Sequence, residues 1–310
     1  MAATTSASTG KLVEVCALDF DLAITLDSGQ VFHWERSGDG FVGTIGEQAV
    51  YVEQRGNSLV TTCGEELIRH YFALDHPLDE ICASFPNDVA MNTARDFCRG
   101  LRIIRQPKWE CLATFICSSM KQVAHIRQIS HKLRERFSEP RRIRNGIVYP
   151  FPSPERIAAS SERELGKCAL GYRAKNLLAT ARRIASGEVD LEKLAQRSGV
   201  DLRSNLCELA GVGAKVANCV MLFAYERLSA FPIDVWIGRV LREKYFPRTR
   251  KLNAARLRAF TQEYFGDHGG YAQQYLFHHA RKSRAKTNKS RRTAGLSPSR
   301  ACDNVSVLNS

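Results

Sequence analysis

The sequence predicts an α+β fold, in which an antiparallel, β-rich N-terminal domain precedes a two-lobed, all-α body. Over residues 11–62, short β-branched and aromatic runs alternate with Ser-Gly, Asp-Gly and Gly-Asn turn signals, as in an antiparallel meander. From residue 64 onward, apolar residues recur at helical spacing. We therefore expect four parts: a disordered leader (1–10), the β-rich N-terminal domain (11–95), the helical domain (96–280) and a basic disordered tail (281–310).

The helical body is predicted from apolar residues spaced three and four apart. Short connections with Pro and Gly, such as "YPFPSPERI", separate its segments. The clearest segments span residues 87–103, 109–137, 161–186 and 205–228. From residue 281 the chain is dense in Lys, Arg, Ser and Thr and almost without large apolar side chains, which predicts disorder. This tail could attract phosphate or serve as a nuclear address, and a merely solvated tail is an equal alternative.

The overall composition points to a polyanionic partner. Lys and Arg number 45 against 32 Asp and Glu, which leaves a formal net charge of +13 and an isoelectric point near 9.4. This excess favours nucleic acid, although a basic protein without that function would show the same balance. Ten cysteines occur singly, without the C-x-x-C pair of a zinc finger or redox motif.

No segment indicates export or membrane insertion. The N-terminus "MAATTSASTG" lacks the basic-then-apolar pattern of a signal peptide, and no run approaches the ~18 apolar residues of a membrane span. Unpaired thiols also suit a reducing compartment. We therefore expect an intracellular monomer that does not associate with membranes.

The stretch "ELAGVGAKVANCV" predicts two helices joined by a tight turn at Gly211, Val212 and Gly213. Glycines adopt backbone angles closed to other residues and let the chain approach a ligand closely. The second helix offers unpaired N–H groups and the positive end of its dipole, which together bind phosphate. Such a turn holds a DNA backbone without reading its sequence. This is the pattern of a helix-hairpin-helix element.

Lys215 and Asp234 are the candidate catalytic pair. Lys215 lies in the first turn of the second helix, where the helix dipole disfavours a cation and makes the neutral, nucleophilic amine easier to reach. Desolvated amines of this kind form Schiff bases. Asp234 follows Pro232 and is predicted to cap the next helix, so its carboxylate would be fixed in direction and ionised. The alternatives are a phosphate-contacting lysine and a purely capping aspartate.

Seven blocks now carry a resemblance: "DSGQVFHW", "YFALD", "RQPKWECLATFICSS", "LGYRAKNL", "ELAGVGAKVANCV", "FPIDVW" and "GYAQQYLF". In this order, over residues 12–280, they resemble the 8-oxoguanine DNA glycosylase/AP-lyase family of the helix-hairpin-helix glycosylases. The resemblance implies a TBP-like N-terminal domain and a two-lobed helix-hairpin-helix glycosylase core. It also implies that the damaged base flips out of duplex DNA. Lys215 would then attack the sugar C1′ with help from Asp234, and β-elimination would nick the strand.

The resemblance also assigns the base pocket. Gly29 matches the glycine whose backbone carbonyl accepts the N7–H of 8-oxoguanine, and guanine would present only a bare acceptor there. Gln273 matches the glutamine that reads the pairing edge. Phe277 and Cys219 match the two residues that sandwich the ring. Judged without the resemblance, Phe277 and Cys219 would be ordinary core residues.

Four positions concern the opposite strand. Tyr172 matches the wedge that fills the vacated stack, and Arg173 matches the arginine that bonds the orphaned base. Judged without the resemblance, Tyr172 would be a surface aromatic and Arg173 a phosphate-binding arginine. The better-known eukaryotic members carry asparagines and an arginine after "FICSS", where this chain has Met120 and His125. Met120 cannot hydrogen-bond in the same way, and His125 is shorter and usually neutral. We therefore predict a relaxed preference for the opposite base.

Two further positions depart from the family pattern. Trp236 stands where a phosphate-binding histidine is common, so stacking or its indole N–H would replace that contact, and Asn218 replaces a charged residue. The expected partner is double-stranded DNA containing 8-oxoguanine, in the nucleus of a eukaryote or in the cytoplasm or nucleoid of a bacterium. No metal or redox cofactor is expected.

Three alternatives stay open. A glycosylase of the endonuclease III type is disfavoured because its C-terminal four-cysteine loop is missing: only Cys302 follows Cys219. A glycosylase for alkylated bases is disfavoured because that type lacks the hairpin lysine. The alternative from another class is a non-catalytic DNA-binding protein in which Lys215 only contacts phosphate.

Overall fold

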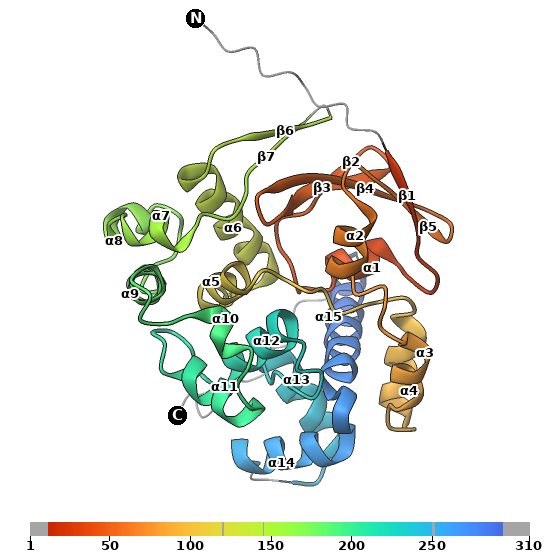
Figure 1. Ribbon diagram of the computed structural model, residues 1–310. Coiled ribbons are helices and arrows are strands. Elements are labelled where there is room, and N and C mark those ends of the chain that lie inside the picture. Colours follow the sequence, from red (N-terminus) through yellow and green to blue (C-terminus); the bar gives the residue numbers. More distant parts are fainter. Residues whose placement is uncertain (1–11, 120, 145, 250–251, 294–310) are drawn as a thin grey trace, which may run out of the picture. The chain divides into compact units, whose positions relative to one another are not determined.

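A computed structural model describes residues 12–119, 121–144, 146–249 and 252–293. The predicted α+β architecture is confirmed: an antiparallel sheet near the N-terminus is followed by a helical body (Figure 1). The chain divides into two compact units, each made from two stretches. The first unit comprises Met1–His76 and Gly100–Arg227, and the second comprises Pro77–Arg99 and Leu228–Ser310.

The main sheet of the first unit has five antiparallel strands. They are β1 (Val13–Cys16), β2 (Glu35–Ser37), β3 (Gly40–Ile45), β4 (Gln48–Arg55) and β5 (Ser58–Thr61), in the spatial order β1-β5-β4-β3-β2. Strands β2 to β5 form the predicted meander, and β1 pairs with β5 at the edge. Tight turns connect β3 to β4 and β4 to β5, and Gly46 (φ +56°) and Gly56 (φ +57°) supply their left-handed angles.

The core of this sheet is built around Trp34. Its ring lies so close to Gly43 that a Cβ there would be 2.6 Å from it, so only glycine fits at that position of β3. Trp34 also donates a hydrogen bond to the hydroxyl of Tyr71 (3.1 Å), and Phe72 packs beside both rings. This cluster joins the sheet to α2 (Glu65–Tyr71) and to the loop that begins at Gly29.

The rest of the first unit is helical, apart from a small hairpin of β6 (Arg141–Ile143) and β7 (Gly146–Val148). The remaining helices are α1 (Leu22–Asp27), α5 (Lys108–Ser118), α6 (Val123–Phe137), α7 (Pro154–Ala158), α8 (Glu162–Gly166), α9 (Arg173–Ala185), α10 (Leu191–Leu194), α11 (Gly199–Cys207) and α12 (Ala214–Tyr225). Helices α5 and α12 are apolar on nearly all sides, as expected for helices buried at the centre of a domain, and they pack on each other.

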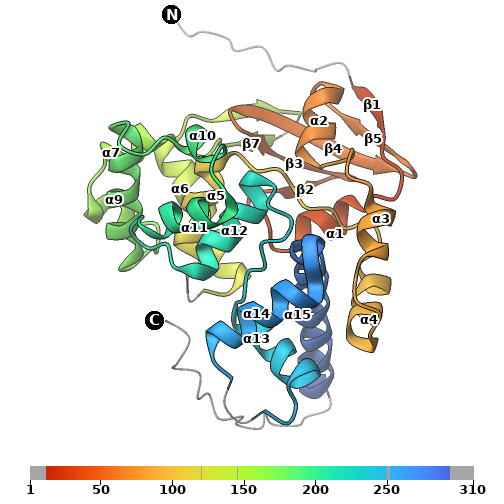
Figure 2. The same ribbon diagram turned by 60° about the horizontal axis from the view of Figure 1, so that its bottom comes forward.

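The second unit is all-helical. Its elements are α3 (Leu78–Ala83), α4 (Val89–Phe97), α13 (Val235–Val240), the π-helical η1 (Leu241–Tyr245), α14 (Ala254–Phe265), the 3-10 turn η2 (Gly266–His268) and α15 (Gly269–Thr293). Helices α4, α13 and α14 all contact α15 (Figure 2). The carboxylate of Asp88 caps α4 and accepts the hydroxyls of Tyr245 (3.1 Å) and Tyr264 (3.0 Å), which fastens α4 to the aromatic cluster of this unit.

The predicted disordered tail is wrong in its first part. Helix α15 continues to Thr293, so residues 281–293 are helical. The stretch contains Lys, Arg and Ala, which favour helix, and neither Gly nor Pro. It also extends a helix that is already formed, and such growth avoids the cost of nucleation. Residues 294–310 and the predicted leader 1–10 lie outside the described residues.

The two units do not follow the linear division predicted at residue 95, which falls within α4. Residues of Pro77–Arg99 group with the C-terminal helices, and the chain then returns to the first unit at Gly100. In the part of the chain that the structure describes, none of the helices combines the length and apolar character that a membrane crossing needs.

Candidate active site

The hairpin forms as predicted, between α11 and α12. Gly211 has φ +82°, and a Cβ there would lie 2.9 Å from the Cβ of Asn176, so both the angle and the close approach require glycine. Gly213 is the N-cap residue of α12 and makes no side-chain capping bond. Nothing lies within 4 Å of where its Cβ would be. The first turn of α12 therefore keeps N–H groups without a side-chain cap, as a phosphate site requires.

Lys215 is half-buried in this first turn, and a serine from another helix fixes its amine. Its Nζ donates to Oγ of Ser118 at 3.2 Å, and the hydroxyl of Ser118 donates to the carbonyl of Phe115 at 2.8 Å. Since that single proton is already used, Ser118 can only accept from the lysine. The amine also lies 5.0 Å from the centre of the Phe115 ring, within the range of a cation–π contact.

The surroundings of the amine are apolar. The Phe115 ring stacks on Phe223 at 5.5 Å with an interplanar angle of 13°. Cys219 is buried four residues after Lys215, on the same face of α12. Cys111 is buried nearby on α5, and burial raises the pKa of its thiol, which keeps that thiol neutral. The predicted pair of Lys215 and Cys219 thus shares one apolar wall with Phe115 and Phe223.

Gly29 lies in the loop between α1 and β2 and has φ +88°. The residues on both sides of it, Ser28 and Gln30, are fully buried. Gln30 bonds to the extended segment 101–106, which we call the connecting segment. Hydrogen bonds between Gln30 and this segment therefore fix the Gly29 loop.

In the second unit, Asp234 is the N-cap residue of α13, as predicted. Its carboxylate accepts the N–H of Ile237 at 2.8 Å, which holds it in one direction. Trp236 lies in the first turn of the same helix, and the guanidinium of Arg284 is 5.8 Å from its ring centre. A capping carboxylate and an aromatic side chain that pairs with a cation therefore lie two residues apart.

Gln273 and Phe277 lie four residues apart on α15 and so share one face of that helix. Gln273 is 4% exposed, and its Oε1 has no hydrogen-bond partner among the residues that the structure describes. Phe277 is half-buried. A buried amide oxygen without a partner costs free energy, and such a group is typical of a site that receives a polar ligand.

Tyr172 and Arg173 form a stacked pair at the start of α9. Tyr172 is 62% exposed, and the guanidinium of Arg173 lies 4.4 Å from its ring centre. Arg173 is buried: its Nε and Nη2 donate to the carbonyl of Ser119, and its Nη1 donates to the carbonyl of Leu170 (3.1 Å). His125 is exposed in the first turn of α6.

Met120 lies outside the described residues. The other predicted positions are divided between the two units: Gly29, His125, Tyr172, Arg173, Gly211, Val212, Gly213, Lys215 and Cys219 in the first, and Asp234, Trp236, Gln273 and Phe277 in the second. The prediction missed Ser118 and Phe115, which contact Lys215. It also missed Gln30 and Gln106, which bond the loop around Gly29. Their only signal was membership of the blocks "DSGQVFHW" and "RQPKWECLATFICSS".

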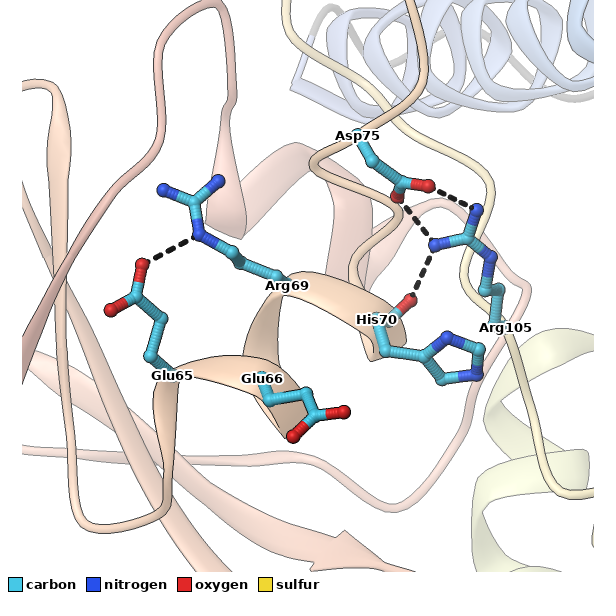
Figure 3. A pocket seen from close by; sticks show the side chains of 6 residues that line it. All are labelled: Glu65, Glu66, Arg69, His70, Asp75 and Arg105. Carbon is cyan, nitrogen blue, oxygen red and sulfur yellow. Dashed lines mark hydrogen bonds and ion pairs between the residues drawn. The ribbon is translucent and has the colours of Figure 1, made fainter.

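A surface hollow of about 520 Å³ in the first unit contains none of the predicted site residues (Figure 3). Four of its charged groups pair with one another: Arg105 donates to both oxygens of Asp75, and Arg69 bonds Glu65 (2.7 Å). The Arg105 guanidinium lowers the pKa of Asp75 to about 2. Glu66 also lines the hollow, and among the described residues its carboxylate has no ion-pair partner. Within the described ranges, no cluster of three or more His, Cys, Asp or Glu could hold a metal ion.

Comparisons with known proteins identify the family. Residues 13–112 match the family model for the N-terminal domain of 8-oxoguanine DNA glycosylase, and residues 113–263 match that for HhH-GPD superfamily base excision DNA repair proteins. An N-glycosylase/DNA lyase of Arabidopsis thaliana is 30% identical over 281 residues, covering 84% of this chain and 77% of the plant protein. A probable N-glycosylase/DNA lyase of Methanothermobacter thermautotrophicus is 27% identical, covering 86% of this chain and 95% of that protein.

A solved structure extends the comparison to three dimensions. It is the Clostridium acetobutylicum 8-oxoguanine glycosylase/lyase in complex with double-stranded DNA containing cytosine opposite to 8-oxoguanine. The TM-score is 0.81 and the identity is 31%, over 86% of this chain and 93% of that chain. The similarity therefore runs through most of the chain and is not limited to the hairpin.

Proposed function

This chain belongs to the 8-oxoguanine DNA glycosylase family, and we propose that it excises 8-oxoguanine from duplex DNA and then cleaves the strand as an AP lyase. The observation that carries this proposal is the placement of Lys215. Its amine is fixed by Ser118 at the start of the hairpin helix, next to the N–H groups that would hold the DNA backbone. The substrate is cellular DNA, in agreement with the named activities of the relatives.

Lys215 is the nucleophile of the proposed reaction. Its neutral Nζ attacks C1′ while the bond from C1′ to N9 breaks, and the base leaves with that electron pair. Loss of a proton from the nitrogen and opening of the sugar ring then give a Schiff base at C1′. Removal of a proton from C2′ breaks the bond between C3′ and its oxygen, and the 3′ phosphate leaves. Asp234 assists as a fixed carboxylate that stabilises positive charge on the sugar.

The proposed base pocket follows the family resemblance. The carbonyl of Gly29 accepts the N7–H of 8-oxoguanine, Gln273 bonds the pairing edge, and Phe277 and Cys219 cover the two faces of the ring. The buried, unpartnered Oε1 of Gln273 supports its part, since a base would supply the missing donor. Guanine lacks the N7–H and would leave the Gly29 carbonyl facing an acceptor.

The proposed opposite-strand contacts predict relaxed selection of the partner base. Tyr172 is exposed, as a wedge must be, while His125 and Met120 replace the polar side chains that favour cytosine. Arg173 uses three of its five N–H groups on backbone carbonyls, so two remain for the orphaned base without loss of its anchors. Trp236 and the turn from Gly211 to Gly213 would hold the backbone phosphates.

Borohydride trapping tests the proposal. A duplex with one 8-oxoguanine, paired in turn with each of the four bases, is incubated with wild type and with Lys215→Gln. We expect a covalent protein–DNA adduct that is lost in the variant, with yields and excision rates that differ little among the four pairs. If wild type gives no adduct and no nicking but binds DNA tightly, the protein is a non-catalytic DNA-binding protein. Rates that differ by orders of magnitude, with cytosine far ahead, would refute only the relaxed preference.

A further inference from the structure

We infer that Gln30 and Gln106 are positioning residues that fix the backbone immediately after Gly29 and thereby hold the Gly29 carbonyl where it selects 8-oxoguanine. The inference rests on the proposed function, because it takes the Gly29 carbonyl to be the group that accepts the N7–H of the base. Neither glutamine needs to touch the base. Both act through the backbone of the Gly29 loop.

Gln30 uses its whole side chain to bind the protein backbone and Ser28. It is 0% exposed. Its Nε2 donates to the carbonyl of Arg102 (2.8 Å) and to Oγ of Ser28 (2.9 Å), and its Oε1 accepts the N–H of Ile104 (2.8 Å). Both N–H donors of the amide are therefore occupied, and its oxygen is bonded. A buried glutamine bonded in this way is a fixed structural link and is not free to read a base.

Gln106 holds the next peptide along the chain, between Gln30 and Val31. It is 6% exposed, and its Nε2 donates to the backbone carbonyl of Gln30 at 2.9 Å. Its backbone N–H donates to the carbonyl of Phe223 in α12 (2.8 Å). One residue therefore connects the Gly29 loop to the helix that carries Lys215 and Cys219. The recognising carbonyl and the nucleophile are fixed relative to each other within the first unit.

The orientation of the peptide between Gly29 and Gln30 decides which base fits. Gly29, at φ +88°, has no Cβ to restrict rotation of the peptide plane that follows it. If that plane turned over, the N–H of Gln30 would point where the Gly29 carbonyl now points. A donor there would pair with the bare N7 of guanine and would oppose the N7–H of 8-oxoguanine. Turning the plane over would require a positive φ at Gln30, which a residue with a side chain rarely adopts. Because the side chain and the carbonyl of Gln30 are both bonded, this residue cannot shift to relieve that strain.

The test separates base recognition from the later chemistry. Gln106→Met removes the Nε2 donor at similar volume, and Ser28→Ala is a milder second variant that removes one bond of Gln30. Single-turnover rates are measured on a duplex with 8-oxoguanine and on the same duplex with a preformed abasic site, where no base is read. Binding to duplexes with 8-oxoguanine and with guanine is compared in the Lys215→Gln background. Thr61→Val is the control, because it deletes a buried bond to the Tyr51 carbonyl (2.8 Å) in the sheet.

We expect Gln106→Met to slow excision and to lower the binding preference for 8-oxoguanine over guanine, each by about tenfold, the size of one hydrogen bond. Abasic-site cleavage should fall much less, and Thr61→Val should change neither ratio. Equal losses on both substrates, or an unchanged binding preference, would overturn the inference while leaving the proposed function intact. If wild type itself neither excises 8-oxoguanine nor is trapped, the proposed function is wrong, and this inference is then wrong as well.

Discussion

Lys215 is oriented by a serine that precedes it by 97 residues in the chain. The proton of Ser118 is committed to the carbonyl of Phe115, so the serine accepts one N–H of the lysine. In the proposed reaction, an amine held in this way would use its lone pair on the sugar, because Ser118 accepts one of its N–H groups. The Phe115 ring beside the amine stacks on Phe223, so this side of the amine is apolar.

Replacing Ser118 with alanine tests this arrangement. We expect Ser118→Ala to lower the single-turnover rate and the yield of borohydride trapping by about 3- to 10-fold, because the amine loses one hydrogen bond that orients it. Ser160→Ala is the matched control, since Ser160 makes the same kind of bond to the carbonyl of Ile157 (2.7 Å) and contacts no lysine. Equal effects of the two changes would show that Ser118 only supports its helix.

The sequence could place the reacting groups but not the residues that orient them. Lys215 and Asp234 follow from local patterns, a glycine turn and a helix cap, and the cap is confirmed. Ser118 and Gln106 give no such signal, because their partners lie far along the chain. A serine near the end of an apolar helix and a glutamine in an extended segment look ordinary until the fold brings them to Lys215 and Gly29.

At the scale of secondary-structure elements, a buried polar cluster joins β3, α5 and α6. Glu110 of α5 pairs with Arg134 of α6, which also donates to the side chain of Thr44 and to the carbonyl of Tyr149 (both 2.9 Å). His33 bonds the carbonyl of Thr44 (2.9 Å) and lies 3.4 Å from Glu110. Because Arg134 already balances Glu110, His33 is neutral and acts as a hydrogen-bond donor. The helical pattern of α5 and α6 was predictable, but the meeting of these polar side chains inside the protein was not.

This cluster predicts a loss of stability at acid pH. Burial, together with the nearby Arg134, holds the pKa of His33 well below its usual range. In the unfolded chain the imidazole regains a pKa of about 6.5, so below that pH the unfolded state binds more protons and the free energy of unfolding falls. We expect a melting temperature that is level above about pH 7 and drops as the pH falls below about 6.5.

The contribution of His33 is isolated by difference. His33→Gln keeps a donor for the carbonyl of Thr44 but cannot be protonated, so its melting temperature should depend less on pH than that of wild type over the same range. Identical pH profiles for the two proteins would mean that His33 is not the group responsible.

At the scale of the whole molecule, the division into units could not be predicted from the order of the sequence. Residues of Pro77–Arg99 belong to the second unit because α4 packs on α15. Helix α15 begins about 180 residues after α4 in the sequence. Only the contacts between such distant segments define the units. The predicted sheet needed no such information, because β2 to β5 pair with their neighbours in sequence.

Part of the net charge of +13 lies on one helix. Residues 281–293 hold seven basic residues and no acidic one, and they belong to α15, not to a disordered tail. Beyond residue 293 the sequence contains only Arg300 and Asp303 as charged side chains, which cancel. Any attraction of this end of the chain for DNA phosphates must therefore arise mainly from the end of α15.

Two truncations separate these regions. Ending the chain after Arg284 removes Lys286, Lys289, Arg291 and Arg292, whereas ending it after Thr293 keeps all four. Each phosphate contact contributes about 0.9 to the slope of log affinity against log salt. We therefore expect the shorter chain to bind undamaged duplex more weakly and with a shallower slope, by up to about 3.6 for four lost contacts, when fluorescence anisotropy is measured from about 50 to about 200 mM salt. The longer chain should match wild type, and equal slopes for all three proteins would place the DNA contacts elsewhere.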